Sequence, residues 1–203
     1  MKKKILILFV FVLVTASAWS LGIGGGALWD WNLNSGWDAS SFGNQNYRQD
    51  NMSLGGFAFL DMTFLELDLS FAYGIFKETI GTSGLEQSVE PKAFQLGISA
   101  LGKLPIGLLG FYIFPILGIN YNMVLSYSYD GYSYDAPMEL SQFGLLGGLG
   151  LDIPLGTSLF IRGEGLFQLR LPNIENLSVL TDPDFSAKFG MGPRIKLGAG
   201  YRF

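Results

Sequence analysis

Hydrophobic and polar residues alternate one by one along most of this chain. The last sixteen residues show the pattern most clearly, because every second residue from Phe189 to Phe203 is apolar. The residues between them, from Lys188 to Arg202, are glycine, lysine or arginine. A period of two is that of a β-strand, whose side chains point alternately to opposite faces. The pattern predicts a strand over residues 188–203 with one apolar face and one face of glycine and charge.

The same two-faced pattern recurs seven more times after residue 20, and helical periodicity competes with it nowhere. The predicted strands cover residues 21–32, 52–61, 64–75, 93–103, 109–129, 132–153, 159–171 and 188–203. Their connections alternate between tight turns and long polar segments, and the long polar segments are residues 33–50, 76–92 and 172–186. An even number of strands joined in this way predicts an all-β, antiparallel up-and-down barrel with two different rims.

Periodicity alone does not say which face meets water, because a soluble barrel would show the same alternation with its apolar face inward. Three features favour a membrane barrel. The polar face consists mostly of glycine and carries few charges, whereas a hydrated surface carries many. The two rims are unequal, and aromatic residues gather at both strand ends, as they do at lipid–water interfaces. These aromatics are Trp29, Trp31, Tyr73, Tyr121, Phe143 and Phe189 toward the long segments, and Phe64, Phe111, Tyr201 and Phe203 toward the turns.

Closure of the barrel follows from the same physics. Lipid offers no hydrogen bonds to an exposed strand edge, so the first and last strands are expected to pair with each other. The sequence therefore predicts a membrane-spanning eight-stranded barrel, with its apolar face toward lipid and its glycine-rich face toward an enclosed lumen.

The first twenty residues have a different pattern. Lys2, Lys3 and Lys4 precede ten apolar residues, Ile5 to Val14, and the small residues of Ala16-Ser17-Ala18 follow. This arrangement is that of a secretory signal peptide, and its apolar run is too short for a membrane-spanning helix. We expect a signal peptide over 1–20, cleaved after Ala18 or Ser20, and one barrel domain over 21–203. No later apolar run is long enough for a membrane helix.

Composition limits the chemistry available to this chain. Its 203 residues include 28 glycines, no cysteine and no histidine, and 15% are charged, against about 25% in an average domain. Loss of the three leading lysines would leave 10 basic against 17 acidic residues, a net charge of −7, which disfavours nucleic acid as a partner. A histidine-based triad, a thiol nucleophile and an ordinary zinc site are excluded. We expect no enzymatic activity, no metal and no cofactor.

Charged residues at inward positions predict an ion network in the lumen. By strand parity this network contains Glu66, Asp68, Arg162, Glu164, Arg194 and Lys196. Catalysis by Glu66, Asp68 and Glu164 is the enzymatic alternative to such a structural core. Inward apolar positions carry Phe57, Phe59, Tyr112, Phe114 and Ile116. An eight-stranded barrel has room for its side chains or for one small ligand. The lumen is therefore either filled by side chains or a narrow channel or binding barrel for small, mostly apolar solutes.

The segment "SYSYDGYSYD" predicts a hairpin, because Asp-Gly is a strong turn signal. Centring the turn on Asp130-Gly131 pairs Tyr129 with Tyr132 and Tyr127 with Tyr134. Cross-strand aromatic pairs contribute roughly 0.2–1 kcal/mol each, so the four tyrosines are expected to stabilise a projecting hairpin. Tyrosine-rich surfaces also bind protein or glycan, which makes these residues a candidate surface for an extracellular ligand.

The signal peptide, the eight alternating strands and the ending Tyr-Arg-Phe resemble the small outer-membrane barrels of the OmpA, OmpX and OmpW type. The resemblance implies a monomer in the outer membrane of a two-membrane bacterium, in contact with outer-membrane lipid. It also implies that Tyr201 and Phe203 belong to the signal that the outer-membrane assembly machinery recognises. Architecture of this kind says little about activity. The leading expectation is a structural or surface-interaction protein, and the similarity to OmpW suggests the porin-like alternative.

Overall fold

The computed structural model describes residues 21–38, 45–82, 85–90, 92–129, 132–135, 141–171 and 190–203. Eight long strands make up the main sheet: β1 (Gly22–Asp38), β2 (Gln45–Asp61), β3 (Leu65–Thr82), β5 (Lys92–Lys103), β7 (Phe111–Tyr129), β9 (Gln142–Leu155), β10 (Leu159–Arg170) and β11 (Gly190–Arg202). Three short strands pair with them: β4 (Leu85–Val89), β6 (Ile106–Leu108) and β8 (Tyr132–Asp135). Within the described ranges no helix is long and apolar enough to cross a membrane. The predicted signal peptide and the predicted loop 172–186 lie outside these residues.

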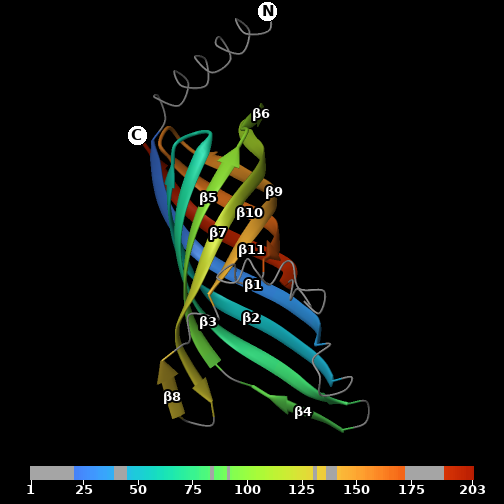
Figure 1. Ribbon diagram of the computed structural model, residues 1–203. Helices are drawn as coiled ribbons and strands as arrows, with labels where there is room; N and C mark the ends of the chain where they lie inside the picture. The colour runs from blue at the N-terminus through green and yellow to red at the C-terminus, as the bar shows by residue number, and fades with distance from the viewer. Residues whose placement is uncertain are drawn as a thin grey trace, which may run out of the picture.

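The eight long strands close into one antiparallel barrel, which confirms the predicted fold class (Figure 1). The first and last strands pair from Gly22 with Arg202 to Asn34 with Gly190. The β2–β3 pairing joins the two ends of the strand order. Because every long strand has two neighbours, the backbone hydrogen bonds of the barrel wall are satisfied internally, as a hydrocarbon environment requires.

The outer surface of the barrel is apolar and the inner surface is polar. On β3, Leu67 and Leu69 are 42% and 53% exposed, whereas their neighbours Glu66 and Asp68 are buried inside. Aromatic residues are exposed near both rims, among them Trp31, Tyr73, Phe143, Tyr201 and Phe203. Water-soluble proteins rarely expose a large contiguous apolar surface, and this belt matches the lipid-facing band of a membrane barrel.

The two rims differ in a way that corrects the predicted loops. The short rim carries tight turns, and the opposite long rim carries strands that continue well beyond the barrel (Figure 1). Strands β1, β2, β3 and β7 contain 17, 17, 18 and 19 residues, and about 9–11 suffice to cross hydrocarbon. The segments 33–50 and 76–92, predicted as loops, are therefore largely strand. Strand pairing continues there because backbone hydrogen bonding does not require apolar alternation.

The predicted strand 132–153 is also wrong as a single element. The structure has β8, which pairs with Ser126–Tyr129 of β7, and then β9, which pairs with residues 112–122 of the same strand. The sequence places Pro137 between the two, and proline lacks the donor that a continuous ladder would need. β8 is thus the return arm of a hairpin at the long rim (Figure 1).

Glycines on the inner face make room for large rings. A β-carbon on Gly24 would collide with the ring of Phe59, one on Gly200 with the rings of Phe160 and Phe59, and one on Gly150 with the ring of Phe114. The inner glycines therefore do not leave a wide pore. They allow aromatic rings from facing strands to fill the barrel.

Candidate functional site in the barrel lumen

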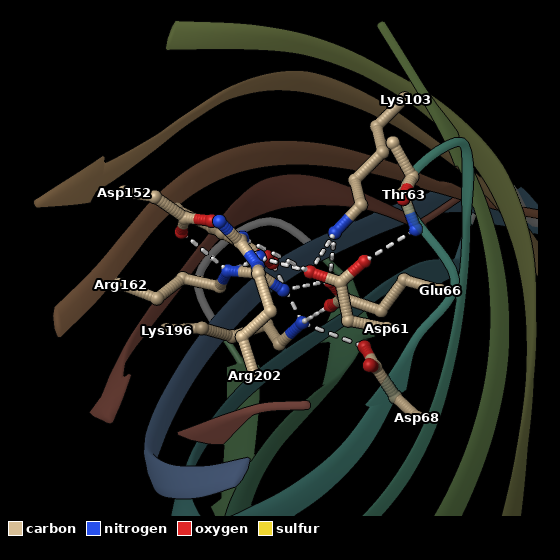
Figure 2. Close-up of polar contacts among 10 residues, drawn as sticks. Asp61, Thr63, Glu66, Asp68, Lys103, Asp152, Arg162, Lys196 and Arg202 are labelled. Atoms are coloured by element: carbon tan, nitrogen blue, oxygen red, sulfur yellow. Dashed lines mark hydrogen bonds and ion pairs between the residues drawn. The ribbon is translucent and has the colours of Figure 1, made fainter. Parts of the chain in front are cut away.

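The half of the lumen next to the short rim is filled by charged side chains. We call this group the short-rim network, and it consists of Asp61, Glu66, Asp68, Lys103, Asp152, Arg162, Glu164, Lys196 and Arg202. Its carboxylates come from β2, β3, β9 and β10, and its cations from β5, β10 and β11. Figure 2 labels every member of the network except Glu164 and shows the labelled side chains converging from different walls of the barrel. Five carboxylates thus meet four cations in one enclosed space.

Arg162 lies at the centre of the short-rim network. Its Nε and Nη2 donate to the two carboxylate oxygens of Asp152 at 2.7 and 2.6 Å, a bidentate arrangement. Nη2 also donates to Asp61 Oδ2 at 2.5 Å, and Nη1 donates to Glu66. The side chains of Arg162 and Glu66 are 0% exposed. One guanidinium therefore joins three strands across the lumen.

Two lysines complete the same network. Lys196 Nζ donates to Asp68 Oδ2 and Glu164 Oε2, both at 2.6 Å, and to Glu66 Oε1 at 3.3 Å. Lys103 Nζ lies 2.8 Å from Asp61 Oδ2 and 2.9 Å from Glu66 Oε2. Because each lysine bridges carboxylates from different strands, the network resists any opening of a path through its centre.

Aromatic rings surround the charges of the short-rim network. The guanidinium of Arg162 lies 4.6 Å from the ring centroid of Phe59 and 5.0 Å from that of Phe160. Lys196 Nζ lies 4.6 Å above Phe57. Such cation–π contacts are strongest when they are desolvated. The predicted inward residues Phe57, Phe59, Phe114 and Ile116 are all buried in the lumen.

A second, smaller charged group lies toward the long rim. We call Asp30, Arg170 and Arg194 the long-rim cluster. Asp30 Oδ2 accepts from Arg194 Nη2 at 2.7 Å and from Arg170 Nη2 at 3.2 Å. Asn32 Nδ2 donates to Asp30 Oδ1 at 2.8 Å. Arg194 was predicted to belong with the other five residues, but the structure places it in this separate cluster.

Six charged residues of the lumen were missing from the predicted network. They are Asp30, Asp61, Lys103, Asp152, Arg170 and Arg202. Strand parity carries the signal for them, since Asp30 has the same parity as Gly22, Gly24 and Gly26, and Arg170 lies two residues beyond inward Gln168. With these six included, the described lumen contains six acidic and six basic side chains.

The lumen opens at the short rim into a cavity of about 320 Å³. It is lined by Asp61, Thr63, Lys103, Pro105, Tyr112, Phe114, Asp152 and Arg202. Tyr112, predicted to face inward, is 39% exposed because it stands at this mouth. The guanidinium of Arg202 lies 5.8 Å from the Tyr112 ring centroid. The buried short-rim network forms the floor of the cavity.

The remaining predicted site residues lie at the rims. The hairpin has the predicted register, with Tyr127 opposite Tyr134 and Tyr129 opposite Tyr132. Tyr132 is 68% exposed. At the other rim the ring centroids of Tyr201 and Phe203 are 5.1 Å apart, and the Phe203 N–H donates to the Leu21 carbonyl at 2.8 Å. The chain end is thus anchored to the start of the first strand.

Comparison with known proteins agrees with this architecture. No family model matches the chain, and no curated protein matches its sequence. Among solved structures, the outer membrane protein OprG from Pseudomonas aeruginosa superposes with a TM-score of 0.55 at 17% identity, covering 91% of this chain and 95% of OprG. Neisserial surface protein A gives a TM-score of 0.46 at 11% identity, covering 90% and 97% of the two chains. Outer membrane protein W of E. coli gives 0.45 at 15% identity, covering 91% and 97%. The likeness to OprG supports the fold and nothing beyond it.

Proposed function

We propose that the protein is a monomeric outer-membrane barrel that does not conduct solutes and that presents its long-rim hairpins as an interaction surface outside the cell. The observation that carries the proposal is the short-rim network. Arg162 and Glu66 are wholly buried and tied to several strands, so any solute path would have to break their ion pairs. The apolar belt on the outer wall supports placement in a bilayer.

The surface role is supported by the shape of the long rim. Strands β3 and β7 continue past the barrel into hairpins with β4 and β8 (Figure 1). A closed barrel that only filled membrane area would need no such extensions. The exposed ring of Tyr132 is the type of rigid, partly polar side chain that contributes to binding surfaces. We infer that Tyr127, Tyr129, Tyr132 and Tyr134 form the contact region for an extracellular ligand.

We also infer that the protein is not an enzyme. Glu66, Asp68 and Glu164 are the carboxylates that an acid–base mechanism would use, and all three contact Lys196. They are buried below the floor of the short-rim cavity, where a substrate does not reach them. Among the described residues no group of acidic side chains is arranged to hold a metal ion.

Planar-bilayer recording tests the proposal directly. The purified barrel should produce no defined single-channel steps, because the short-rim network closes the lumen. Reproducible conductance, or uptake of small apolar solutes into vesicles, would instead favour the channel alternative, for which the short-rim cavity would be the entrance.

The double change Glu66→Ala with Asp68→Ala tests the role of the network. It removes two of the three carboxylates that buried Lys196 contacts and one of the carboxylates that Arg162 contacts, and breaking a buried ion pair from one side costs about 3–5 kcal/mol. We expect a correspondingly lower free energy of unfolding in urea. The control is Arg202→Ala at the mouth, whose side chain is 30% exposed and whose loss should cost much less. Unchanged stability together with new conductance would contradict a structural plug.

A further inference from the structure

We propose that the long-rim half of the lumen binds a small soluble oxyanion, a carboxylate or phosphate, between Arg170 and Arg194. This site goes beyond the proposed function, which depends on the short-rim network and not on the long-rim cluster. Arg170 comes from β10 and Arg194 from β11, and both guanidinium groups donate to the same oxygen of Asp30. Among the side chains described in this half of the lumen, two cations therefore share one carboxylate.

The imbalance matters because the cluster is buried. Arg170 and Arg194 are 6% and 3% exposed, and Asp30 is 2% exposed. A buried charge that lacks a partner is expensive, so an excess positive charge in this position favours a second anion. The short-rim network does not supply it, because its own carboxylates bind Lys103, Arg162, Lys196 and Arg202.

Buried amides in the same half of the lumen carry side-chain nitrogens with no hydrogen-bond partner. They are the amides of Asn51, Gln95, Asn120, Asn122 and Gln168, which come from β2, β5, β7 and β10. Each of these residues is at most 6% exposed. Gln168 is 0% exposed and both atoms of its amide lack partners. Asn120 and Gln168 crowd the same inner glycine, Gly144, so they approach each other across β9.

The unpartnered groups favour an acceptor ligand. Among the described side chains around the cluster, the unpartnered donors are the amide nitrogens of Asn51, Gln95, Asn120, Asn122 and Gln168 and the Nε atoms of Arg170 and Arg194. The unpartnered acceptors are fewer, namely the amide oxygens of Asn32, Asn51, Asn120 and Gln168. Carboxylate and phosphate oxygens accept several hydrogen bonds and fit the planar fork of arginine.

The position of the cluster selects a soluble anion over a lipid headgroup. Arg170 and Arg194 alternate with lipid-facing Leu169 and Ile195 and point to the opposite side of the wall. A headgroup attached to acyl chains in the bilayer cannot reach that side, whereas a free anion is not confined to the bilayer.

Nuclear magnetic resonance of the arginine side chains tests this site. Inorganic phosphate is titrated into the purified barrel in neutral detergent micelles, replacing chloride at a constant ionic strength of about 0.15 M. We expect saturable shifts of the Nε–Hε resonances of Arg170 and Arg194 and none of Arg202. Addition of phosphatidylglycerol to the micelles in place of phosphate should leave these resonances unmoved.

Three variants sharpen the result. Arg170→Gln should weaken phosphate binding about tenfold, the effect of losing one charge-assisted hydrogen bond. Asp30→Asn removes the competing carboxylate and should strengthen binding several-fold. The control, Arg202→Gln, removes an arginine from the other end of the lumen and should leave the affinity unchanged. Heat-modifiable migration in gels checks that each variant is folded.

The outcomes separate cleanly. Shifts that do not saturate, or that occur equally at Arg202, would overturn the site, as would an Asp30→Asn variant with unchanged or weaker binding. Movement of the resonances by phosphatidylglycerol alone would overturn the soluble source. If Arg170→Gln does not fold, the wild-type titration and the Gln168→Met variant test the site instead. Gln168→Met removes only the amide group and should weaken phosphate binding. The conductance experiment above is independent of all these results.

Discussion

At the scale of single residues, the lumen is built from glycines paired with large side chains. Phe114 illustrates the arrangement: its ring is 1% exposed, and the guanidinium of Arg162 lies 5.2 Å from its centroid. Lys103 Nζ lies 5.1 Å from the centroid of the same ring. The ring also occupies the space that a β-carbon on Gly150 would need. The ring is therefore fixed by cations and by the backbone of the neighbouring strand.

This packing predicts the effect of one added methyl group. Gly150→Ala should lower the free energy of unfolding by about 1–3 kcal/mol, because a β-carbon there would overlap the buried ring of Phe114 and force it to shift. Gly147 lies on the same strand, and nothing would lie within 4 Å of a β-carbon there. Gly147→Ala is the matched control, with an expected change within about 0.5 kcal/mol. Equal effects of the two changes, measured by urea unfolding, would refute the ring-to-glycine packing.

The residue scale also shows what the sequence could predict. Parity is a local property, so alternation predicted the shared polar face of Glu66, Asp68, Arg162 and Lys196, and the assignment of the apolar face to lipid made that polar face the inner one. The ion-pair partners of these residues were not predictable, because they depend on the position of each residue along the barrel axis. Arg194 pairs with Asp30 since the β1–β11 register places them opposite each other, and no sequence pattern states that register.

At the scale of the strands, the apolar belt and the strand length are set by different forces. Burial in lipid requires alternation over about 10 residues, and the sequence pattern marks that stretch well. Beyond it, β1 and β2 continue pairing to Asp38 and Gln45 through polar residues. Water tolerates either a strand or a loop there, so composition alone predicted loops. The central spans were therefore predictable, and the long-rim extensions were not.

Phe203, at the end of the last strand, allows a role in outer-membrane assembly to be distinguished from a role in the stability of the folded barrel. Phe203 is 69% exposed, and its backbone N–H, not its ring, holds the chain end to Leu21. Phe203→Ala should change the unfolding free energy of the purified barrel by less than about 1 kcal/mol, since little burial is lost. In cells it should strongly reduce the amount of heat-modifiable protein in the outer membrane, if Tyr201 and Phe203 are read by the assembly machinery.

Leu197→Ala is the control for that experiment. Leu197 lies on the same strand, faces lipid and is 61% exposed, so its truncation removes apolar surface without touching the chain end. Its level in the outer membrane should match that of the wild type. Equal loss for both variants would show that lipid contact, and not recognition of the chain end, explains the effect of Phe203→Ala.

At the scale of the whole molecule, the barrel reverses the usual arrangement of a soluble protein. Charge is concentrated inside, in the short-rim network and the long-rim cluster, and leucine and aromatic side chains lie outside. A buried ion lattice costs desolvation and requires nearly complete pairing. In a closed barrel the hydrogen-bonded strands fix the positions of the charged side chains. The ion pairs can therefore form with good geometry and offset the cost of desolvation.

Spin labelling in lipid bilayers tests this inversion most directly. The chain has no cysteine, so single cysteines can be placed on β3 without competing thiols, at Leu67 and Leu69 on the outer wall and at Ser70 on the inner wall. Nitroxides at 67 and 69 should collide frequently with oxygen dissolved in lipid and rarely with a water-soluble nickel complex, whereas the label at 70 should show little access to lipid-dissolved oxygen. High nickel accessibility at 67 and 69, with high oxygen accessibility at 70, would contradict the account.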